Sequence, residues 1–129
     1  MIYILHNIFP IFAAMLVGLV IGLAWLRMSG RAMPSVGAVA IIAVCEFWLA
    51  AILAGALILA PPQAGAWQMA LGSAVIIWVG FILPAFAATL RALGEPWSRI
   101  AAVAAHWLVV MLAQAATMQA VGLTAPPAG

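Results

Sequence analysis

Charged side chains are nearly missing from this sequence: only 5% of its 129 residues are Asp, Glu, Lys or Arg. Soluble domains carry about 25% charged residues, which they need to cover an apolar core. The hydrophobic share is correspondingly high, at 70%. A water-soluble fold is therefore excluded, and we expect a protein solvated by a lipid bilayer.

Lysine is absent altogether, and the charge consists of four arginines against two glutamates. That is too little positive charge for a nucleic-acid surface. The single cysteine, Cys45, has no partner within the chain, which excludes an internal disulfide or a cysteine metal site. Phosphate-binding glycine loops, nucleophile elbows and zinc-spaced histidines are also missing. The sequence therefore gives no indication of an enzyme site, and it requires no metal or cofactor.

The apolar residues gather in four segments, each long enough to cross a bilayer as a helix of about 20 residues. The N-terminus lacks the positive region and cleavage site of a secretory signal, so the first segment is interpreted as a retained helix. The predicted helices span residues 8–26, 36–60, 67–90 and 100–121. We therefore predict an all-α membrane protein with a single transmembrane domain, residues 1–129, in which two antiparallel helical hairpins form one four-helix bundle.

The first and third connections, residues 27–35 and 91–99, contain all the arginines, namely Arg27, Arg31, Arg91 and Arg99. The positive-inside rule places both loops in the cytoplasm and both termini in the periplasm of a bacterial inner membrane. In each loop a glycine suits the end of the preceding helix, and a serine (Ser35 or Ser98) suits the start of the next one. The shared pattern Leu-Arg-x-x-Gly fits either a parallel internal repeat or the reuse of one turn.

Glu46 stands near the middle of the second predicted helix, about 16 Å from its start at Ser35. An ionised carboxylate at that depth costs at least about 2.5–3.5 kcal/mol. We therefore expect Glu46 to face the bundle interior. It would be either a proton-relay, ion-binding or ligand-binding group, or a neutral carboxyl that bonds a neighbouring helix.

His106 lies about 12 Å into the fourth predicted helix from the same side, so it could meet Glu46 if the two helices pack together. Gln114 and Thr117 of the same helix, with Trp78 of the third, would complete a narrow internal polar site. A lone histidine in a bundle can equally be a satisfied core residue.

A haem or pigment held by both His6 and His106 of one chain is excluded, because they are roughly 20 Å apart along the membrane normal. Ligation by His106 alone stays open, although nothing else in the sequence supports it. Pro84 lies inside the third predicted helix, where it should kink the helix and free the carbonyl of Gly80.

Gly18 and Gly22 form a GxxxG pattern, which lets helices approach closely within a bundle or between protomers. With so few residues outside the predicted helices, this favours a small polytopic inner-membrane protein that acts by association. It would be a homo-oligomer or an accessory subunit of a membrane complex. The competing hypothesis is a small transporter or channel with an internal site at Glu46 and His106.

Three stretches carry a resemblance to a known family: Gly22-Leu-Ala-Trp25, Trp78-Val-Gly-Phe81, and His106 followed by Trp107-Leu-Val-Val. They resemble a bacterial family of four-helix membrane proteins known as domain of unknown function 1761, over most of the chain. The resemblance implies a bacterial inner-membrane protein of four helices. It favours His106 as a functional position and brings no known activity with it.

Overall fold

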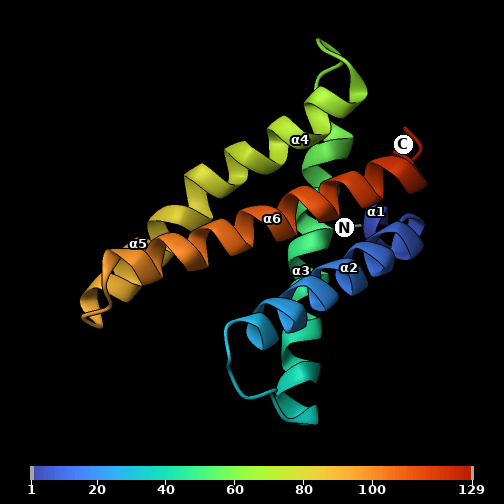
Figure 1. Ribbon diagram of the computed structural model, residues 1–129. Helices are drawn as coiled ribbons and strands as arrows, with labels where there is room; N and C mark the ends of the chain where they lie inside the picture. The colour runs from blue at the N-terminus through green and yellow to red at the C-terminus, as the bar shows by residue number, and fades with distance from the viewer. Residues whose placement is uncertain (1, 129) are drawn as a thin grey trace.

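The computed structural model describes residues 2–128, and every regular element within that range is a helix (Figure 1). Three long helices are continuous: α2 (Ile8–Met28), α3 (Val36–Leu59) and α6 (Trp97–Val121). A fourth long helix consists of three consecutive segments, α4 (Ala66–Ile77), η1 (Trp78–Ile82) and α5 (Leu83–Ala92). All four are long and apolar enough to cross a membrane. The prediction of an all-α bundle of four such helices is confirmed.

The helix ends agree with the predicted spans to within three residues, and a short additional helix, α1 (Ile2–His6), precedes them. Ser35 caps α3 as expected, because its side chain accepts a hydrogen bond from the Ala38 amide at 3.3 Å. The expectation that Ser98 caps the last helix is wrong. α6 already begins at Trp97, because the extended Pro96 directs the chain into the helix and its carbonyl accepts from the Ile100 amide at 3.2 Å.

The helices α2 and α5 each end in a turn of the same type. In each, a glycine adopts a positive φ, 67° at Gly30 and 80° at Gly94. Two backbone bonds close each turn: Gly30 N to Arg27 O and Arg31 N to Leu26 O in the first, Gly94 N to Arg91 O and Glu95 N to Leu90 O in the second. This is the Schellman arrangement, for which glycine is favoured. One shared turn therefore accounts for the similar loop sequences without an internal repeat.

The third long helix changes its pitch ahead of Pro84. Residues Trp78–Ile82 form a π-helical turn, and the Leu83 amide donates to the Trp78 carbonyl five residues before it. Proline has no amide hydrogen, and its ring displaces the carbonyl four residues earlier. The expected disturbance at Pro84 is thus a widened turn, with Trp78 at its first position.

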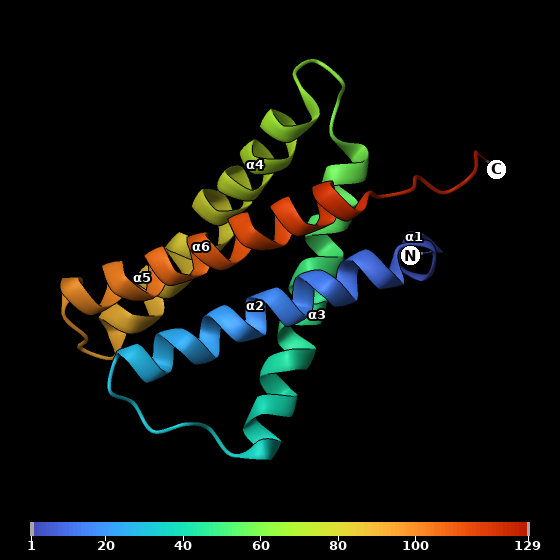
Figure 2. The ribbon, with the colours of Figure 1, turned by 45° about the vertical axis from the view of Figure 1, so that its right-hand side comes forward.

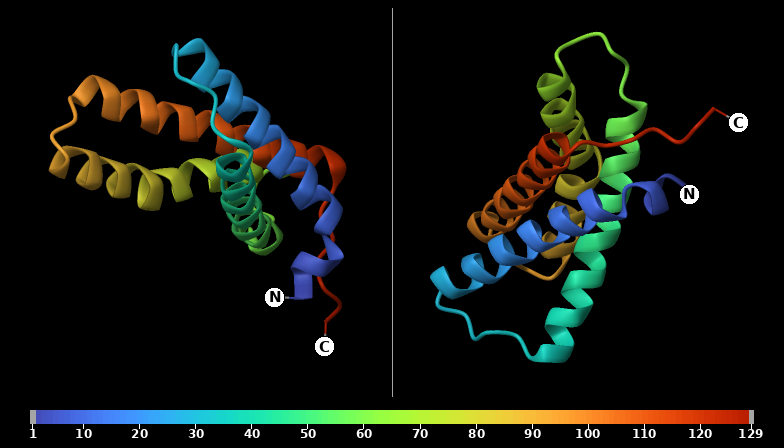
Figure 3. Two further views of the ribbon diagram at one scale, coloured as in Figure 1. Left: turned by 90° about the horizontal axis from the view of Figure 1, so that it is seen from below. Right: turned by 90° about the vertical axis from the view of Figure 1, so that its right-hand side faces the viewer.

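The bundle is packed unevenly along its length. α6 lies between α2 and the α4–α5 segment, while α3 crosses α2 and α6 steeply (Figures 1, 2 and 3). We call the end that carries residues 29–35 and 93–96 the arginine-loop end, and the end where both chain termini lie the terminal end (Figure 2). The buried residues of α2 stop at Gly18, and those of α3 start at Glu46. The N-terminal half of α3 therefore projects from the bundle at the arginine-loop end.

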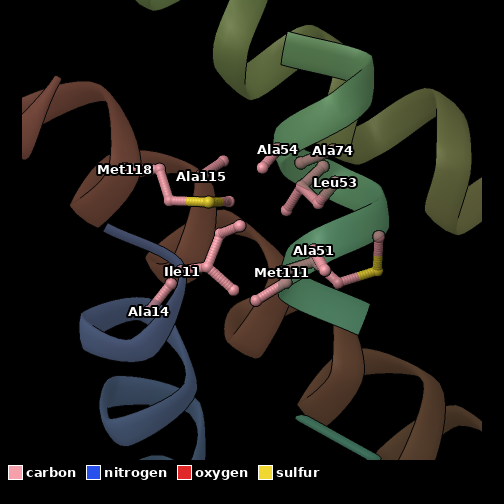
Figure 4. Close-up of a cluster of buried hydrophobic side chains, with 10 residues drawn as sticks. Ile11, Ala14, Ala51, Leu53, Ala54, Ala74, Met111, Ala115 and Met118 are labelled. Atoms are coloured by element: carbon pink, nitrogen blue, oxygen red, sulfur yellow. The ribbon is translucent and has the colours of Figure 1, made fainter. Parts of the chain in front are cut away.

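The packed core occupies the terminal half of the bundle. Its side chains point toward a common centre, where Met111 and Met118 of α6 meet Ile11 of α2 and Leu53 of α3 (Figure 4). Alanines let the helices approach closely around these larger side chains. The alanines of this cluster are Ala14, Ala50, Ala51, Ala54, Ala74 and Ala115.

Asn7 separates α1 from α2 and holds the C-terminal tail. Its side chain is buried; Nδ2 donates to the carbonyls of Tyr3 and Thr124, each at 2.8 Å, and Oδ1 accepts from the Thr124 amide at 2.7 Å. Sequence patterns do not indicate this contact, because Asn7 and Thr124 lie 117 positions apart. One side chain thus joins the two ends of the chain.

Asn7→Ala should release the segment after Val121, because the backbone amide and carbonyl of Thr124 both lose the Asn7 side chain as their hydrogen-bond partner. We expect faster hydrogen–deuterium exchange at the Thr124 amide in detergent micelles, while the α6 amides stay protected. Gln63→Ala, in the exposed loop between α3 and α4, is the matched control. Unchanged exchange at Thr124 in the Asn7 variant would show that the contact does not hold the tail.

Candidate functional site

Three helices meet at Glu46 of α3. Its side chain is almost fully buried, and Oε2 accepts a 2.7 Å hydrogen bond from Nε2 of Gln114, which is also fully buried. Gly18 of α2 lies directly against both side chains. A methyl group at Gly18 would come within 2.7 Å of Gln114 Nε2 and would overlap Glu46 Oε2. The first glycine of the GxxxG pattern therefore makes room inside the bundle for a polar contact between α3 and α6.

The second amide atom of Gln114, Oε1, is buried and accepts no hydrogen bond from any described residue. An unpaired buried acceptor of this kind costs about 1–3 kcal/mol. With the amide oxygen and nitrogen exchanged, a protonated Glu46 would donate to Gln114 instead of accepting from it. The amide can therefore bond to Glu46 whether or not the carboxyl carries a proton.

Glu46 has no cation beside it among residues 2–128. The one ion pair in that range joins Glu95 to Arg99, at 3.1 Å, in the loop before α6 and its first turn. An amide partner stabilises a carboxylate through one hydrogen bond but does not neutralise its charge. A buried ion in an apolar environment without a counter-ion costs several kcal/mol. The site therefore favours a carboxyl that is neutralised by a bound proton or cation.

His106 is held by aromatic contacts. Its ring stacks on Trp25 of α2, with centroids 4.5 Å apart and planes inclined by 16°, and it meets the neighbouring Trp107 edge-on at 5.5 Å. Trp25 was not predicted as a partner of His106. The ring is half-buried, and its Cε1 lies 4.0 Å from where a methyl group on Gly22 would stand. Gly18 thus lies against Glu46 and Gln114, and Gly22 lies near His106.

Glu46 and His106 line one small cavity but do not bond to each other. This inner pocket, of about 170 Å³, is also walled by Gly22, Trp25, Leu26 and Val103. Among the side-chain hydrogen bonds of the described residues, the partner of Glu46 is Gln114, which lies about 12 Å further along α6 than His106. Counting depth along each helix assumes parallel helices, whereas α3 crosses α6 (Figure 3). That crossing explains why Glu46 contacts Gln114.

The inner pocket adjoins a larger cavity toward the arginine loops. This outer pocket, of about 820 Å³, includes Ser29, Arg31, Ser98 and Arg99 in its lining. Trp25, Leu26 and Val103 line both pockets and form the partition between them. The packed core begins one turn beyond Glu46 along α3, where Ala50 is fully buried in the same cluster as Met111. The site is therefore nearer to solvent at the arginine-loop end and is closed toward the terminal end.

The two remaining predicted site residues make separate contacts. Trp78 donates from Nε1 to the Ala104 carbonyl at 2.8 Å, which ties η1 to α6. Thr117 donates to the Ala113 carbonyl of its own helix, also at 2.8 Å. Of the five predicted side chains, Glu46 and Gln114 are hydrogen-bonded to each other, and His106 lines the inner pocket together with Glu46. Trp78 and Thr117 lie outside the inner pocket.

Within residues 2–128 no three His, Cys, Asp or Glu side chains lie close enough together to hold a metal ion. The inner pocket, at about 170 Å³, is smaller than the roughly 300–1,000 Å³ of typical small-molecule sites. A haem or pigment on His106 would therefore need the pocket to widen and the Trp25 ring to move. By volume alone, the pocket has room for a few water molecules, and Glu46 and His106 are the polar side chains in its lining.

Comparison with protein-family models, with curated proteins and with solved structures finds no match to this chain. The resemblance to the domain of unknown function 1761 family stays a prediction.

Gly18→Ala should separate Glu46 from Gln114, because the added methyl group overlaps the carboxyl. Overpacking of this kind typically costs about 1–3 kcal/mol, so we expect a lower melting temperature in detergent micelles. Gly72→Ala is the control, since nothing lies within 4 Å of the methyl group that it adds in α4. Equal melting temperatures for the two variants would contradict the close packing at Gly18.

Proposed function

We propose that this chain is a multi-pass protein of a bacterial inner membrane, and that it is a small transporter or channel that binds a proton at Glu46. The arginines of loops 27–35 and 91–99 support a cytoplasmic location of the arginine-loop end, with both termini periplasmic. The proposal is carried by one observation: a carboxyl buried within a membrane-length apolar helix has a neutral amide as its only hydrogen-bond partner among residues 2–128.

The pairing with Gln114 supports a proton as the bound species. The amide offers a donor to the ionised carboxylate and an acceptor to the protonated carboxyl, so Glu46 keeps a hydrogen bond in both states. A purely structural polar contact needs only one of these states.

The cavities support proton exchange from the arginine-loop side. The inner pocket reaches Glu46, and the partition of Trp25, Leu26 and Val103 separates it from the outer pocket. His106 lies in the same pocket, and its ring nitrogens can donate or accept a hydrogen bond there. The packed core closes the other side, so passage across the bilayer requires a second arrangement in which that core opens.

Glu46→Gln should abolish transport, because an amide of nearly the same shape cannot bind a proton. Purified protein would be reconstituted into liposomes that contain a pH-sensitive dye, and proton uptake measured under an imposed pH gradient. We expect the variant to fall to the rate of protein-free liposomes. Glu95→Gln replaces the only other glutamate, which lies outside the helices, and should keep the wild-type rate.

His106→Ala should slow uptake without abolishing it, because His106 lines the pocket but does not bond to Glu46. The proposal fails if wild-type protein gives no uptake above protein-free liposomes. It also fails if Glu46→Gln transports as fast as the wild type.

A second candidate function is association with other membrane-protein subunits, either copies of this chain or components of a larger complex. It is favoured by an apolar groove of about 690 Å³ between α3 and η1, the α3–η1 groove. Trp48 of α3 and Phe81 of η1 face this groove, and the exposed Cys45 lies at its edge. Lipid chains can also fill an apolar groove, so this observation carries less weight than the buried carboxyl.

Cys45 allows the association to be tested without introducing a label. A membrane-permeant bismaleimide should link two copies through Cys45 in native membranes if the α3–η1 groove is a homo-oligomeric interface. Cys45→Ser should abolish the adduct, and native mass spectrometry in mild detergent should give the matching stoichiometry. A strictly monomeric species in every detergent, with no Cys45-dependent adduct, would count against self-association.

A further inference from the structure

We propose that the outer pocket binds the headgroup of an anionic phospholipid. The pocket is formed by the end of α2, the loop that follows it and the first turns of α6. It brings two guanidinium side chains, Arg31 and Arg99, to one cavity from parts of the chain that are far apart in sequence. Glu46 does not line this pocket, although Trp25, Leu26 and Val103 are shared with the inner pocket, and the inference does not depend on the proposed function.

The charge of the pocket favours an anion. Arg31 is exposed and forms no ion pair or side-chain hydrogen bond with any residue in the described range. Arg99 is partly neutralised by Glu95, whose carboxylate lies 3.1 Å from its Nε. The pocket therefore has a net positive charge that comes mainly from Arg31, while the hydroxyls of Ser29 and Ser98 offer further donors.

The rest of the lining fits a lipid better than a free anion. Leu26, Ala102 and Val103 give the pocket an apolar wall that continues into the membrane-length helices. Trp25 has the amphipathic ring that is typical of the membrane–water interface. A phosphate with attached acyl chains can use both the guanidinium groups and this wall, whereas inorganic phosphate can use only the polar part. Basic pockets between membrane helices bind lipid headgroups in this way.

Native mass spectrometry of the full chain in neutral detergent tests the inference directly. The protein would be titrated with phosphatidylglycerol and with phosphatidylcholine of identical acyl chains. We expect one phosphatidylglycerol molecule to bind, and to bind about fivefold or more tightly than phosphatidylcholine. Equal affinity for the two lipids would overturn the assignment to an anionic headgroup.

Arginine variants locate the site. Arg31→Gln should remove the preference for phosphatidylglycerol, and Arg99→Gln should weaken it less. Arg27→Gln removes the same charge from the same region but lies outside the pocket, so it should keep the preference. An equal loss in the Arg27 and Arg31 variants would show that general surface charge is responsible and would overturn the site.

Competition with inorganic phosphate distinguishes a site for a lipid headgroup from a site for a free anion. At a concentration equal to that of the lipid, it should not displace bound phosphatidylglycerol, because it makes no contact with the apolar wall. Displacement at that concentration would overturn the lipid assignment in favour of a free-anion site. Circular dichroism of the Arg31 variant should match the wild type, because the exposed Arg31 side chain makes no contact on which the fold depends.

Discussion

The hydrogen bond between Glu46 and Gln114 is the interaction on which the rest of the structure depends. A carboxyl in the middle of an apolar helix needs a polar partner, and the crossing of α3 over α6 supplies one at 2.7 Å. That contact exists only because residue 18 is a glycine, since any larger side chain would occupy the same space. Glu46, Gln114 and Gly18 thus mark the point where α3, α6 and α2 come closest to one another around a buried polar contact.

This contact also divides the bundle into two halves with different properties. On its terminal side, alanines, methionines and Ile11 form a continuous core with no exposed members (Figure 4). On its arginine-loop side, α3 diverges from the other helices (Figure 1). The inner and outer pockets lie on this side, and both are lined by residues of α2 and α6. The proposed uptake of a proton from one side would require this combination of a closed half and an open half that meet at an ionisable group. Lipid contacts at the open end would stabilise the half in which helix packing is weakest.

The four helices and their order could be predicted from the sequence, because long apolar runs and the turns at Gly30 and Gly94 determine them locally. The inward orientation of Glu46 followed from the cost of exposing a carboxylate to lipid. Its contact with Gln114 could not be derived, because depth counted along parallel helices is wrong when α3 crosses α6. The Asn7–Thr124 contact depends on tertiary structure in the same way. Ser98 failed as a predicted cap because the backbone of Pro96 starts α6 earlier.

The most direct test is solid-state nuclear magnetic resonance of the protein in lipid bilayers. In Glu95→Gln protein, Glu46 is the only glutamate, so ¹³C-labelled glutamate reports on its carboxyl alone. With the Gln114 side chain labelled with ¹⁵N, the account predicts a through-space signal between Glu46 Cδ and Gln114 Nε2 that disappears in Gly18→Ala. Absence of that signal, or a signal from Glu46 to the ring nitrogens of His106 in its place, would contradict it.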